Sequence, residues 1–563
     1  MTMSLTERIQ VAMKRKPAAR VIRKVRVFHL TTGEWEEDTD IALDSRGWIA
    51  AVGPGYEGEE VISGEGLIAV PGFVDAHVHL ESSLMTPRRY ERMVTAHGVT
   101  TAVCDPHELA NVVGEAAFAY YLQAACALKM SLVVRLSSCV PATSLETSGA
   151  TVDSGCLRRW REKYPGLGLG ELMNVPGVLF QDPEVMAKLE GAPFLDGHCP
   201  MVSGEALNAY LSVGVRNDHE CSALPEAREK LRRGLQVLIR EGSAARNLEA
   251  LLPLLTLENS GQLAFCTDDR SPLDMEERGH LDAMVRRAIQ AGVPPLVAYR
   301  VASVSAARGL GLTDRGLIAP GKRGDILLLS DLENCRIQRV FVGGIPREQL
   351  DQVEENADFP SEEPFLHTVR CRLMTPEDFP LLPRDGRPRP VMGVTDGSLL
   401  TERLSLPADA PDVLPVAVVE RHGKNGNVGR GLVRGFGLQA GALASSVGHD
   451  SHNLCVVGTS PQAMAQAINA LRESQGGFAV VRQDGSCLRL PLPVAGLISL
   501  EEGPALATRL RELHQAAREL GCPLHDPFLQ LAFLPLPVIP HLKLTDKGWV
   551  DVDAFRLLAP EES

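Results

Sequence analysis

Two histidines that lie two positions apart, His77 and His79, follow an apolar run that begins at Leu67. Residues two apart on an extended strand project from the same face, so both imidazoles are expected side by side at the end of a buried strand. Two imidazoles on one face are suited to binding a transition-metal ion. The alternative is a pair of polar residues where a strand meets a loop, and the motif alone does not separate the two interpretations.

Further side chains of the kinds that bind metals stand at the ends of later apolar runs. They are Asp105, His107 and Glu108, then Glu171, then His198, then Asp218, His219 and Glu220, and last Asp268 and Asp269. A single histidine at a strand end is more often a capping or packing residue. The joint pattern is much harder to produce by chance, and a mixed set of histidines and carboxylates favours Zn²⁺, Mn²⁺ or Fe²⁺ over Ca²⁺.

The elements that position these side chains alternate, from Pro71 onward, between apolar strand-like runs and helical stretches such as 114–128, 205–212 and 224–235. This alternation is typical of a parallel sheet built from β/α units. The eight candidate strands are 73–80, 100–105, 132–139, 166–173, 193–199, 215–221, 236–241 and 262–268. Eight such units predict an α/β fold with a (β/α)₈ TIM-like barrel, whose chemistry takes place at the carboxyl ends of the strands.

Short β segments with glycine and acidic turns flank this barrel on both sides. We therefore expect the barrel to be inserted in a small β-sandwich. An acidic, proline-containing stretch then predicts a linker before a further α/β unit. The predicted parts are a composite β-sandwich (1–70 with 318–345), the barrel (71–317), the linker (346–365) and a C-terminal α/β domain (366–563).

The composition is that of a soluble globular protein, with 44% hydrophobic and 23% charged residues among 563. A formal net charge of -14 argues against nucleic acid as a partner. The 12 cysteines form no C-x-x-C pair, which indicates reduced thiols in a cytoplasmic protein. The longest apolar stretch near the end is too short to span a bilayer, so no membrane partner is expected. A homodimer is expected because soluble enzymes are often homo-oligomers.

Longer segments surround the candidate ligands: PGFVDAHVHLESS (71–83), VTTAVCDPHELANVVG (99–114), LGLGELMNVPGV (167–178), REGSAARNL (240–248), FCTDDRSP (265–272) and GFGLQAGALASSVGHDSHN (435–453). With these segments the chain resembles the amidohydrolase superfamily and, within it, the adenine deaminase family, over residues 20–555. The H-x-H motif alone would indicate only the superfamily, so the combination makes the resemblance specific.

The resemblance implies two divalent metal ions per chain, Mn²⁺ or Fe²⁺, with Zn²⁺ as a third option. His77, His79 and Asp268 would hold one ion, and His198 and His219 the other. Glu171 would bridge the two ions, in the place where many relatives use a carboxylated lysine. Cyclic amide hydrolases of the hydantoinase and urease type need that lysine, and the fourth strand end of this chain offers only the glutamate.

The reaction implied is the hydrolytic deamination of adenine to hypoxanthine and ammonia by a hydroxide that bridges two divalent metals. Asp268 is expected to accept the proton of the water, and Glu171 or Glu108 to pass protons to the ring nitrogen and the leaving amine. The residues expected to contact the substrate are Glu81, Ser82, Asp105, His107, Asp269, His449 and His452.

Several of these roles stay open. Asp105, His107 and Glu108 lie in the family's DPHE stretch and are compatible with substrate contact, proton transfer or a further metal. His449 and His452 lie either in a polar loop or at the mouth of the active site. The zinc deaminase signature H-x-E…P-C-x-x-C does not fit, because no P-C-x-x-C follows the H-x-E at residues 79–81.

Two segments depart from the family pattern. Ser271 precedes a proline where the family pattern has a histidine. Residues 421–427, which include Lys424, also differ from the family's usual sequence. Either change could alter substrate preference, so one alternative is a binuclear amidohydrolase that acts on another purine or a cyclic amidine. A second alternative is an inactive barrel that serves as a binding protein, and the presence of every expected ligand argues against it.

Overall fold

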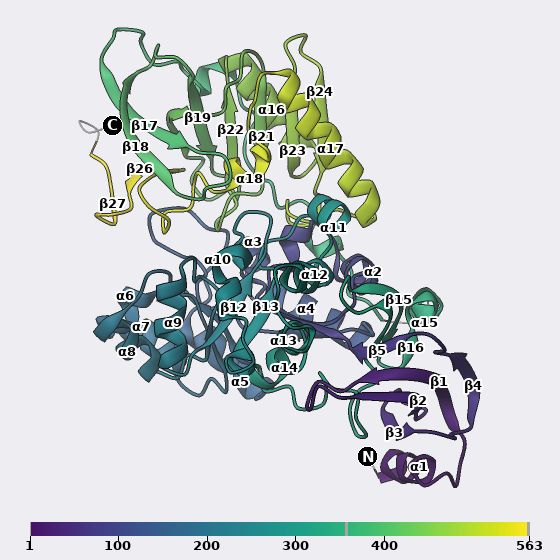
Figure 1. Cartoon of the computed structure of the whole chain (residues 1–563). Coiled ribbons are helices and arrows are strands. Elements are labelled where there is room, and N and C mark those ends of the chain that lie inside the picture. The colour runs from purple at the N-terminus through teal and green to yellow at the C-terminus, as the bar shows by residue number, and fades with distance from the viewer. Residues whose placement is uncertain (1, 355–357, 560–563) are drawn as a thin grey trace.

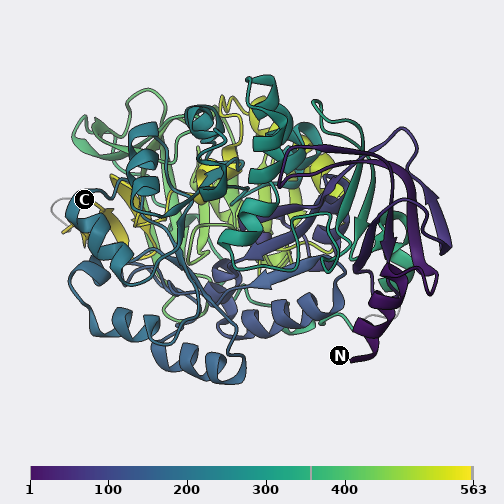
Figure 2. The same cartoon turned by 60° about the horizontal axis from the view of Figure 1, so that its bottom comes forward.

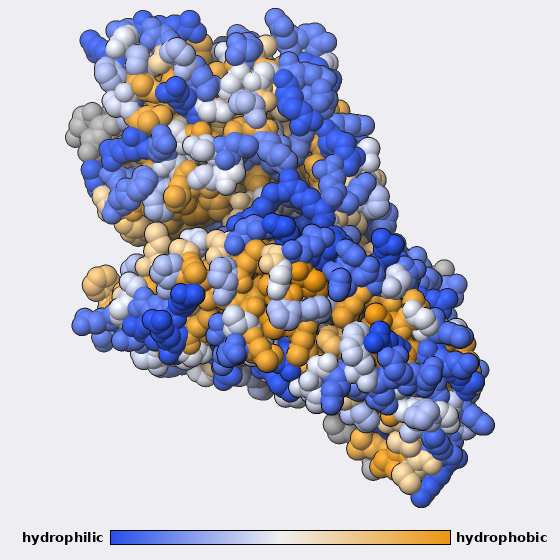
Figure 3. Space-filling view, in the orientation of Figure 1, coloured by the Kyte–Doolittle hydropathy of each residue, from blue (hydrophilic) through white to orange (hydrophobic). Residues whose placement is uncertain are grey.

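Three parts of the chain are stacked in the computed structural model, which describes residues 2–354 and 358–559 (Figure 1). An N-terminal sheet lies at one end, a barrel in the middle and the C-terminal domain at the other end. Figure 2 shows helices around the outside of the barrel and the N-terminal sheet at its side. In the space-filling view of Figure 3, an indentation separates the C-terminal domain from the barrel.

Eight parallel strands form the barrel. They are β6 (Phe73–Val78), β7 (Val99–Cys104), β8 (Ser131–Val134), β9 (Leu169–Leu172), β10 (Leu195–Gly197), β11 (Asn217–Asp218), β12 (Gln236–Arg240) and β13 (Leu263–Cys266). Hydrogen bonds join them as β6–β7–β8, β9–β10 and β11–β12–β13. Parallel bridges from Leu136 to Leu169, from Leu195 to Val215 and from Val78 to Asp268 connect these groups into a ring. The predicted fold class is confirmed.

The observed strands are shorter than the predicted ones at their carboxyl ends. Strand β8, predicted as 132–139, stops at Val134. Beyond it, Ser137 Oγ donates to Asp105 Oδ1 over 2.6 Å and Ser138 Oγ donates to the carbonyl of Glu171 over 2.5 Å. These side-chain contacts take the chain away from regular strand pairing at the end of the barrel where the candidate ligands lie.

The three helical stretches named from the sequence are helices in the structure: α4 (Ala116–Ala127), α8 (Gly204–Ser212) and α9 (Leu224–Arg232). Helix α9 ends before residue 235 because Gly234 has a φ of +84°, a left-handed conformation that ends helices. Other helices of the barrel include α2 (Pro87–Ala96), α5 (Ser154–Lys163), α7 (Pro183–Leu189), α12 (Leu281–Gln290) and α13 (Pro295–Val301).

The N-terminal sheet contains strands from both sides of the barrel. They are β1 (Ala18–Phe28), β2 (Trp35–Leu43), β3 (Ile49–Gly53), β4 (Gly58–Ser63), β5 (Ile68–Pro71), β14 (Ile326–Asp331), β15 (Arg336–Val342) and β16 (Ile345–Pro346). Strand β5 pairs with β1 on one side and antiparallel with β14 on the other. One apolar core joins Ile22 of β1 to Phe341 of β15. The segment that follows the barrel therefore completes the sheet that the segment before it begins.

The C-terminal domain contains an eight-stranded sheet in the order β18–β17–β20–β19–β22–β21–β23–β24. Its strands are β17 (Pro388–Val394), β18 (Thr401–Pro407), β19 (Val413–Val419), β20 (Val428–Arg434), β21 (Ala442–Ser445), β22 (Leu454–Gly458), β23 (Gly477–Val481) and β24 (Cys487–Pro491). Helix α16 (Pro461–Glu473) buries Met464, Ile468 and Leu471 in the same apolar core as residues of β19, β21, β22 and β23. Helix α17 (Gly503–Glu519) packs against α11 (Pro272–Arg278) of the barrel, which ties the two parts together.

A smaller sheet and a short connection complete the chain. The sheet consists of β25 (Leu542–Thr545), β26 (Gly548–Asp551) and β27 (Arg556–Leu557). The stretch predicted as a linker contains the short helix α15 (Leu350–Glu354), and residues 355–357 lie outside the described residues. Across 2–354 and 358–559, no helix combines the length and the apolar character needed to cross a bilayer.

Lys543 in β25 is a fully buried lysine. Its Nζ donates to the carbonyl of Phe533 over 2.9 Å and to that of Leu399 over 3.2 Å. Burial lowers its pKa from 10.5 to about 7, because the charged ammonium loses its hydration.

This buried lysine makes the stability of the protein depend on pH. Between about pH 7 and the unfolded value of 10.5, the unfolded chain binds a proton that the folded chain lacks. We therefore expect the free energy of unfolding to rise with pH across this window by a few kcal/mol, at about 1.4 kcal/mol per pKa unit. Urea unfolding of the wild type and of Lys543→Met, near pH 7 and again near pH 9.5, measures this rise. Equal pH dependence in the two proteins would contradict the assignment.

Candidate metal centre and active site

The bridge that closes the barrel brings Asp268 beside the two histidines of the H-x-H motif. The amide of Asp268 donates to the carbonyl of His77 over 3.0 Å, and the amide of His79 donates to the carbonyl of Asp268 over 3.2 Å. Asp268 has a φ of +57°, a left-handed conformation that is unfavourable for a residue with a side chain. Strain of this kind concentrates at functional sites.

His77, His79 and Asp268 form the first group of candidate ligands. The Nε2 atoms of the two histidines lie 3.2 Å apart. Oδ1 of Asp268 lies 3.1 Å from His79 Nε2 and 3.6 Å from His77 Nε2. All three residues are buried, so three donor atoms converge on a space that bulk water does not reach.

Glu171 connects this group to a second one. Its Oε2 lies 2.8 Å from His198 Nδ1 and 3.1 Å from His219 Nε2. Its Oε1 lies 3.5 Å from His79 Nε2. The ring of His219 stacks on that of His77 with centroids 4.1 Å apart. One carboxylate thus contacts imidazoles of both groups, as a bridging ligand does.

Two of these side chains, His77 and Glu171, have pKa shifts that favour the form a metal ion binds. Burial and the neighbouring imidazoles of His219 and His79 lower the pKa of His77 well below its usual value, which leaves a neutral ring with a free lone pair. Burial by itself raises the pKa of Glu171, but the charge of His198 and the hydrogen bonds of its histidine partners hold that pKa well below its usual value. Burial opposes charge on His79, His198 and His219, but the neighbouring carboxylates outweigh it and raise the pKa of all three, that of His198 to about 9. Neutral imidazole nitrogens and ionised carboxylate oxygens are the donors that a divalent transition metal takes.

Asp105 forms hydrogen bonds with two of the candidate ligands, His79 and Glu171. Its carbonyl lies 3.0 Å from His79 Nδ1, which directs Nε2 of that ring toward the other ligands. Its carboxylate accepts a hydrogen bond from the amide of Glu171 over 2.9 Å and one from Ser137 Oγ. The structure therefore places Asp105, predicted as a substrate contact, where it positions His79 and Glu171.

Arg240 is a site residue that the sequence analysis did not single out. Its Nη1 donates to Asp268 Oδ2 over 2.8 Å and also to the carboxylate of Glu220. Arginine is not a metal ligand, so the pattern of metal-type side chains at strand ends does not include it. Arg240 is nevertheless the last residue of β12, and this position was the available signal.

Glu108 follows β7 at the start of α3 (His107–Val113), and the C-terminal domain reaches it. Its Oε1 lies 2.5 Å from His449 Nδ1 and 3.2 Å from His107 Nε2, and its Oε2 contacts His452 Nε2. The other nitrogen of His107 lies 3.1 Å from Glu171 Oε1. A chain of side chains thus runs from the candidate metal ligands to the C-terminal domain.

The side chains of this group differ in the direction in which their pKa is shifted. Burial opposes charge on His449, but Glu108 outweighs it and raises the pKa of His449 to about 9. Burial lowers the pKa of His452 to about 4. Burial raises the pKa of Asp450 to about 6, and its Oδ2 has no hydrogen-bond partner among the described residues. The 2.5 Å contact of Glu108 and His449 is a charge-assisted hydrogen bond, since two ligands of one ion stand farther apart.

Three other predicted substrate contacts lie beside the first group. Burial raises the pKa of Glu81 to about 7, and its Oε1 accepts a hydrogen bond from the amide of Leu109 over 3.0 Å. Ser82 Oγ donates to the carboxylate of Asp269. Burial and the adjacent charge of Asp268 raise the pKa of Asp269. The Ser82–Asp269 contact couples the segment after β6 to the segment after β13, and the Glu81–Leu109 contact couples it to α3.

One candidate from the strand ends does not point to this centre. Asp218 is fully buried, but its Oδ2 pairs with Lys230 Nζ of α9 over 2.9 Å. Its other oxygen accepts a hydrogen bond from the amide of Cys199 over 2.8 Å. Asp218 therefore supports the strand ends that carry His198 and His219.

The two departures from the family pattern have local partners. The side chain of Ser271 accepts a hydrogen bond from the amide of Asp274 and caps α11. Lys424 Nζ donates to the carbonyl of Ser148 over 2.7 Å. Both side chains hold backbone in place at these contacts.

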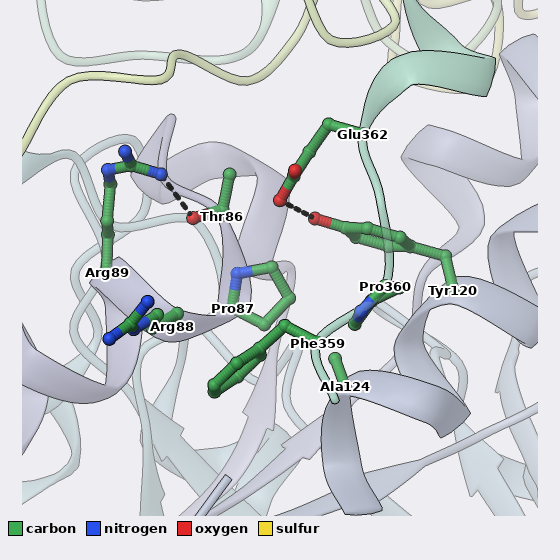
Figure 4. A pocket seen from close by; sticks show the side chains of 9 residues that line it. All are labelled: Thr86, Pro87, Arg88, Arg89, Tyr120, Ala124, Phe359, Pro360 and Glu362. Atoms are coloured by element: carbon green, nitrogen blue, oxygen red, sulfur yellow. Dashed lines mark hydrogen bonds between the residues drawn. The ribbon is translucent and has the colours of Figure 1, made fainter. Parts of the chain in front are cut away.

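A separate pocket of about 150 Å³ lies between α2, α4 and residues 359–362 (Figure 4). Its polar side chains bond to one another: Arg89 Nη1 donates to Thr86 Oγ1 over 3.0 Å, and Tyr120 donates to Glu362 over 3.2 Å. Its lining contains none of the predicted site residues, so we do not place the chemistry there.

Comparison with known proteins gives a consistent picture. The model of the amidohydrolase family matches residues 68–346, and that of the adenine deaminase C-terminal domain matches residues 397–556. An adenine deaminase of Methylobacterium nodulans is 51% identical over 99% of this chain and 100% of that protein. One of Gluconobacter oxydans is 51% identical over 98% and 99%. Among solved structures, an N-acetyl-D-glucosamine-6-phosphate deacetylase from Mycobacterium smegmatis is similar with a TM-score of 0.44 and 17% identity, covering 58% of this chain and 99% of that one.

The position of Asp105 behind the ligands predicts an effect on metal binding. In Asp105→Ala, the amide of Glu171 loses its acceptor, and we expect metal affinity to fall by about 10–100-fold. Competition with a chromogenic chelator measures this change. Asp153→Ala is the matched control, because Asp153 also accepts a backbone amide, that of Cys156 over 2.7 Å, but at the start of α5. Equal affinities in the two variants would contradict the role of Asp105.

Proposed function

The chain belongs to the adenine deaminase family of amidohydrolases, and on that premise we propose that it converts adenine and water to hypoxanthine and ammonia. The observation that carries this proposal is Glu171, one buried carboxylate in contact with His79, His198 and His219. A family of this kind acts on a small-molecule substrate, adenine.

Two divalent ions, Mn²⁺ or Fe²⁺ with Zn²⁺ as a third option, are proposed for this centre. The proposed ligands are His77, His79 and Asp268 for one ion, His198 and His219 for the other, and Glu171 for both. When bound, such ions lower the pKa of a water molecule toward neutrality and so supply a hydroxide nucleophile for C6 of adenine.

Asp268 is proposed as the group that accepts the proton of the attacking water. Arg240 holds its Oδ2 over 2.8 Å, so Oδ1 is the oxygen that remains turned toward the histidines. This contact keeps the carboxylate in one orientation during the transfer. As the water oxygen adds to C6, its first proton is passed to the ring nitrogen. The second O–H proton is lost as the C6 carbonyl forms and the C6–N bond to the amine breaks, and the amine takes up one proton to leave as ammonia.

Glu108 and Glu171 are proposed to deliver these protons, with His107 between them. His107 lies 3.1 Å from Glu171 Oε1 and 3.2 Å from Glu108 Oε1, within reach of proton transfer to either side. His449 and His452 contact Glu108 and hold it in place while it accepts a proton and passes it on. Their contacts favour proton transfer over a further metal as the role of this group.

Substrate binding is proposed for Glu81, Ser82, His107, Asp269, His449 and His452, while the contacts of Asp105 favour a positioning role. Asp450 joins this set, because its unpartnered, buried Oδ2 is an acceptor that a substrate N–H could meet. The partner state and location proposed from the sequence are a homodimer and the cytoplasm.

The direct test is adenine turnover by protein loaded with Mn²⁺ or Fe²⁺, followed as hypoxanthine formation. We expect the wild type to be active and Glu171→Gln to lose at least about 1,000-fold in kcat/KM, because a neutral amide does not replace a bridging carboxylate. Glu205→Gln on the exposed face of α8 is the control and should retain full activity. No adenine turnover by metal-loaded wild type would direct attention to other purines and cyclic amidines.

A further inference from the structure

We propose that Asp546 is a positioning residue of the deamination. Its hydrogen bonds join the C-terminal domain to a barrel loop and thereby hold His449 and His452 in contact with Glu108. The inference rests on the proposed function for its effect on rate. Asp546 lies in the turn between β25 and β26, and the residue is 3% exposed.

The carboxylate of Asp546 accepts hydrogen bonds from four donors. Oδ1 accepts from the amide of Thr147 over 2.8 Å and from Asn453 Nδ2 over 3.4 Å. Oδ2 accepts from Thr147 Oγ1 over 2.7 Å and from Asn427 Nδ2 over 3.2 Å. Because all four partners donate, a carboxylate satisfies them and an amide in its place cannot.

Thr147 belongs to the barrel loop, which we define as residues 144–148. The C-terminal domain holds the backbone of this loop at further points: Lys547 Nζ donates to the carbonyl of Ser144 over 2.8 Å, and Thr545 Oγ1 donates to that of Leu145 over 2.8 Å. At the other end of the loop, Ser148 Oγ donates to the carbonyl of Asn111 over 2.9 Å. Asn111 lies in α3, the helix whose first turn carries Glu108.

Asn453 completes the connection on the other side. Its Nδ2 donates to the carbonyl of Thr147 over 2.9 Å as well as to Asp546. It directly follows His452, which contacts Glu108 Oε2. Asp546 thus fixes Asn453 and Thr147 at the same time, and through them the histidine loop (residues 449–453) and α3.

This arrangement has a mechanistic consequence. Glu108 comes from the barrel, while two of its three histidine partners come from the C-terminal domain. A shift of about 1 Å between the two parts would lengthen both contacts, and a misplacement of that size costs a reaction up to about 100-fold. Buried hydrogen bonds of a charged group are strong enough to prevent such a shift.

The same small sheet offers a matched control. Asp551, in β26, also accepts a hydrogen bond from a side chain of the C-terminal domain, Arg403 Nη1 over 2.6 Å. This pair stays within one domain and does not contact the barrel loop. A loss of general stability in the sheet should follow from changing either aspartate, whereas a loss of positioning should follow only from changing Asp546.

The first experiment compares Asp546→Asn with Asp551→Asn in the full-length, metal-loaded protein. We expect Asp546→Asn to lower kcat/KM for adenine by about 10–100-fold with the metal content of the wild type, and Asp551→Asn to stay within about twofold. If Asp546→Asn does not fold, Thr147→Val removes one of the four donors, and Thr147→Ser, which keeps the hydroxyl, should restore activity. Equal activity of Asp546→Asn and Asp551→Asn, or of Thr147→Val and the wild type, would overturn the proposal.

A double-mutant cycle tests the route of the effect. If Asp546 acts through the histidine loop, Asp546→Asn added to His452→Ala should cost little beyond His452→Ala alone. Full additivity of the two losses would overturn this route.

Hydrogen–deuterium exchange gives a readout that does not depend on the reaction. We expect Asp546→Asn to speed exchange in residues 144–148 and 449–453, while Asp551→Asn leaves both segments protected. If the wild type fails to deaminate adenine, the proposed function is wrong. Exchange then still shows whether Asp546 joins the C-terminal domain to the barrel loop. Unchanged exchange in both segments would show that Asp546 does not hold the two segments in place.

Discussion

One parallel bridge, between Val78 and Asp268, closes the ring of barrel strands, and the candidate metal centre depends on it. His77 lies in the first strand of the ring and His79 directly after it, and Asp268 follows the last strand, 189 residues after His79. Only closure places them within 3.1–3.6 Å of one another. Because every strand of the ring is parallel, all carboxyl ends meet on one side, and Glu171, His198 and His219 arrive there by the same rule.

Bringing so many ionisable groups together out of water is costly unless each has a partner. The structure provides partners from separate regions of the chain. Asp268 has Arg240 of β12, Asp105 bonds the amide of Glu171, and Glu108 has histidines of the C-terminal domain. The removal of one member leaves another buried charge unpaired, so the site is expected to respond to mutation as a network.

The two parts outside the barrel have different structural roles. The N-terminal sheet joins β5, which runs into the first barrel strand, to β14, which follows the last barrel helices, and so fixes both ends of the barrel in one sheet. The C-terminal domain lies over the carboxyl ends of the strands, where it supplies His449 and His452 and contacts α11 through α17. Asp546 ties this cover to the barrel loop, which makes the fit of the two parts a factor in catalysis.

The sequence by itself determined the alternation of strands and helices, and hence the fold class, because apolar periodicity and the order of elements are local properties. It also determined the candidate ligands from His77 to Asp268, since each stands at the end of an apolar run. It did not determine where those runs stop being strands: β8 ends at Val134, and beyond it Ser137 and Ser138 bond to Asp105 and Glu171.

Tertiary structure alone decided which polar side chains face the centre and which support it. Asp218 and Asp268 both stand at strand ends. Asp218 forms an ion pair with the buried Lys230, whereas Asp268 accepts a hydrogen bond from Arg240 and stays beside the histidines of the centre. Asp105, whose role the sequence left open, bonds the amide of Glu171. The contact of Glu108 with His449 joins residues 341 positions apart, and so does not follow from any local pattern. The physical reason is that pairing of buried charges depends on the neighbours in space, which the order of residues along the chain does not specify.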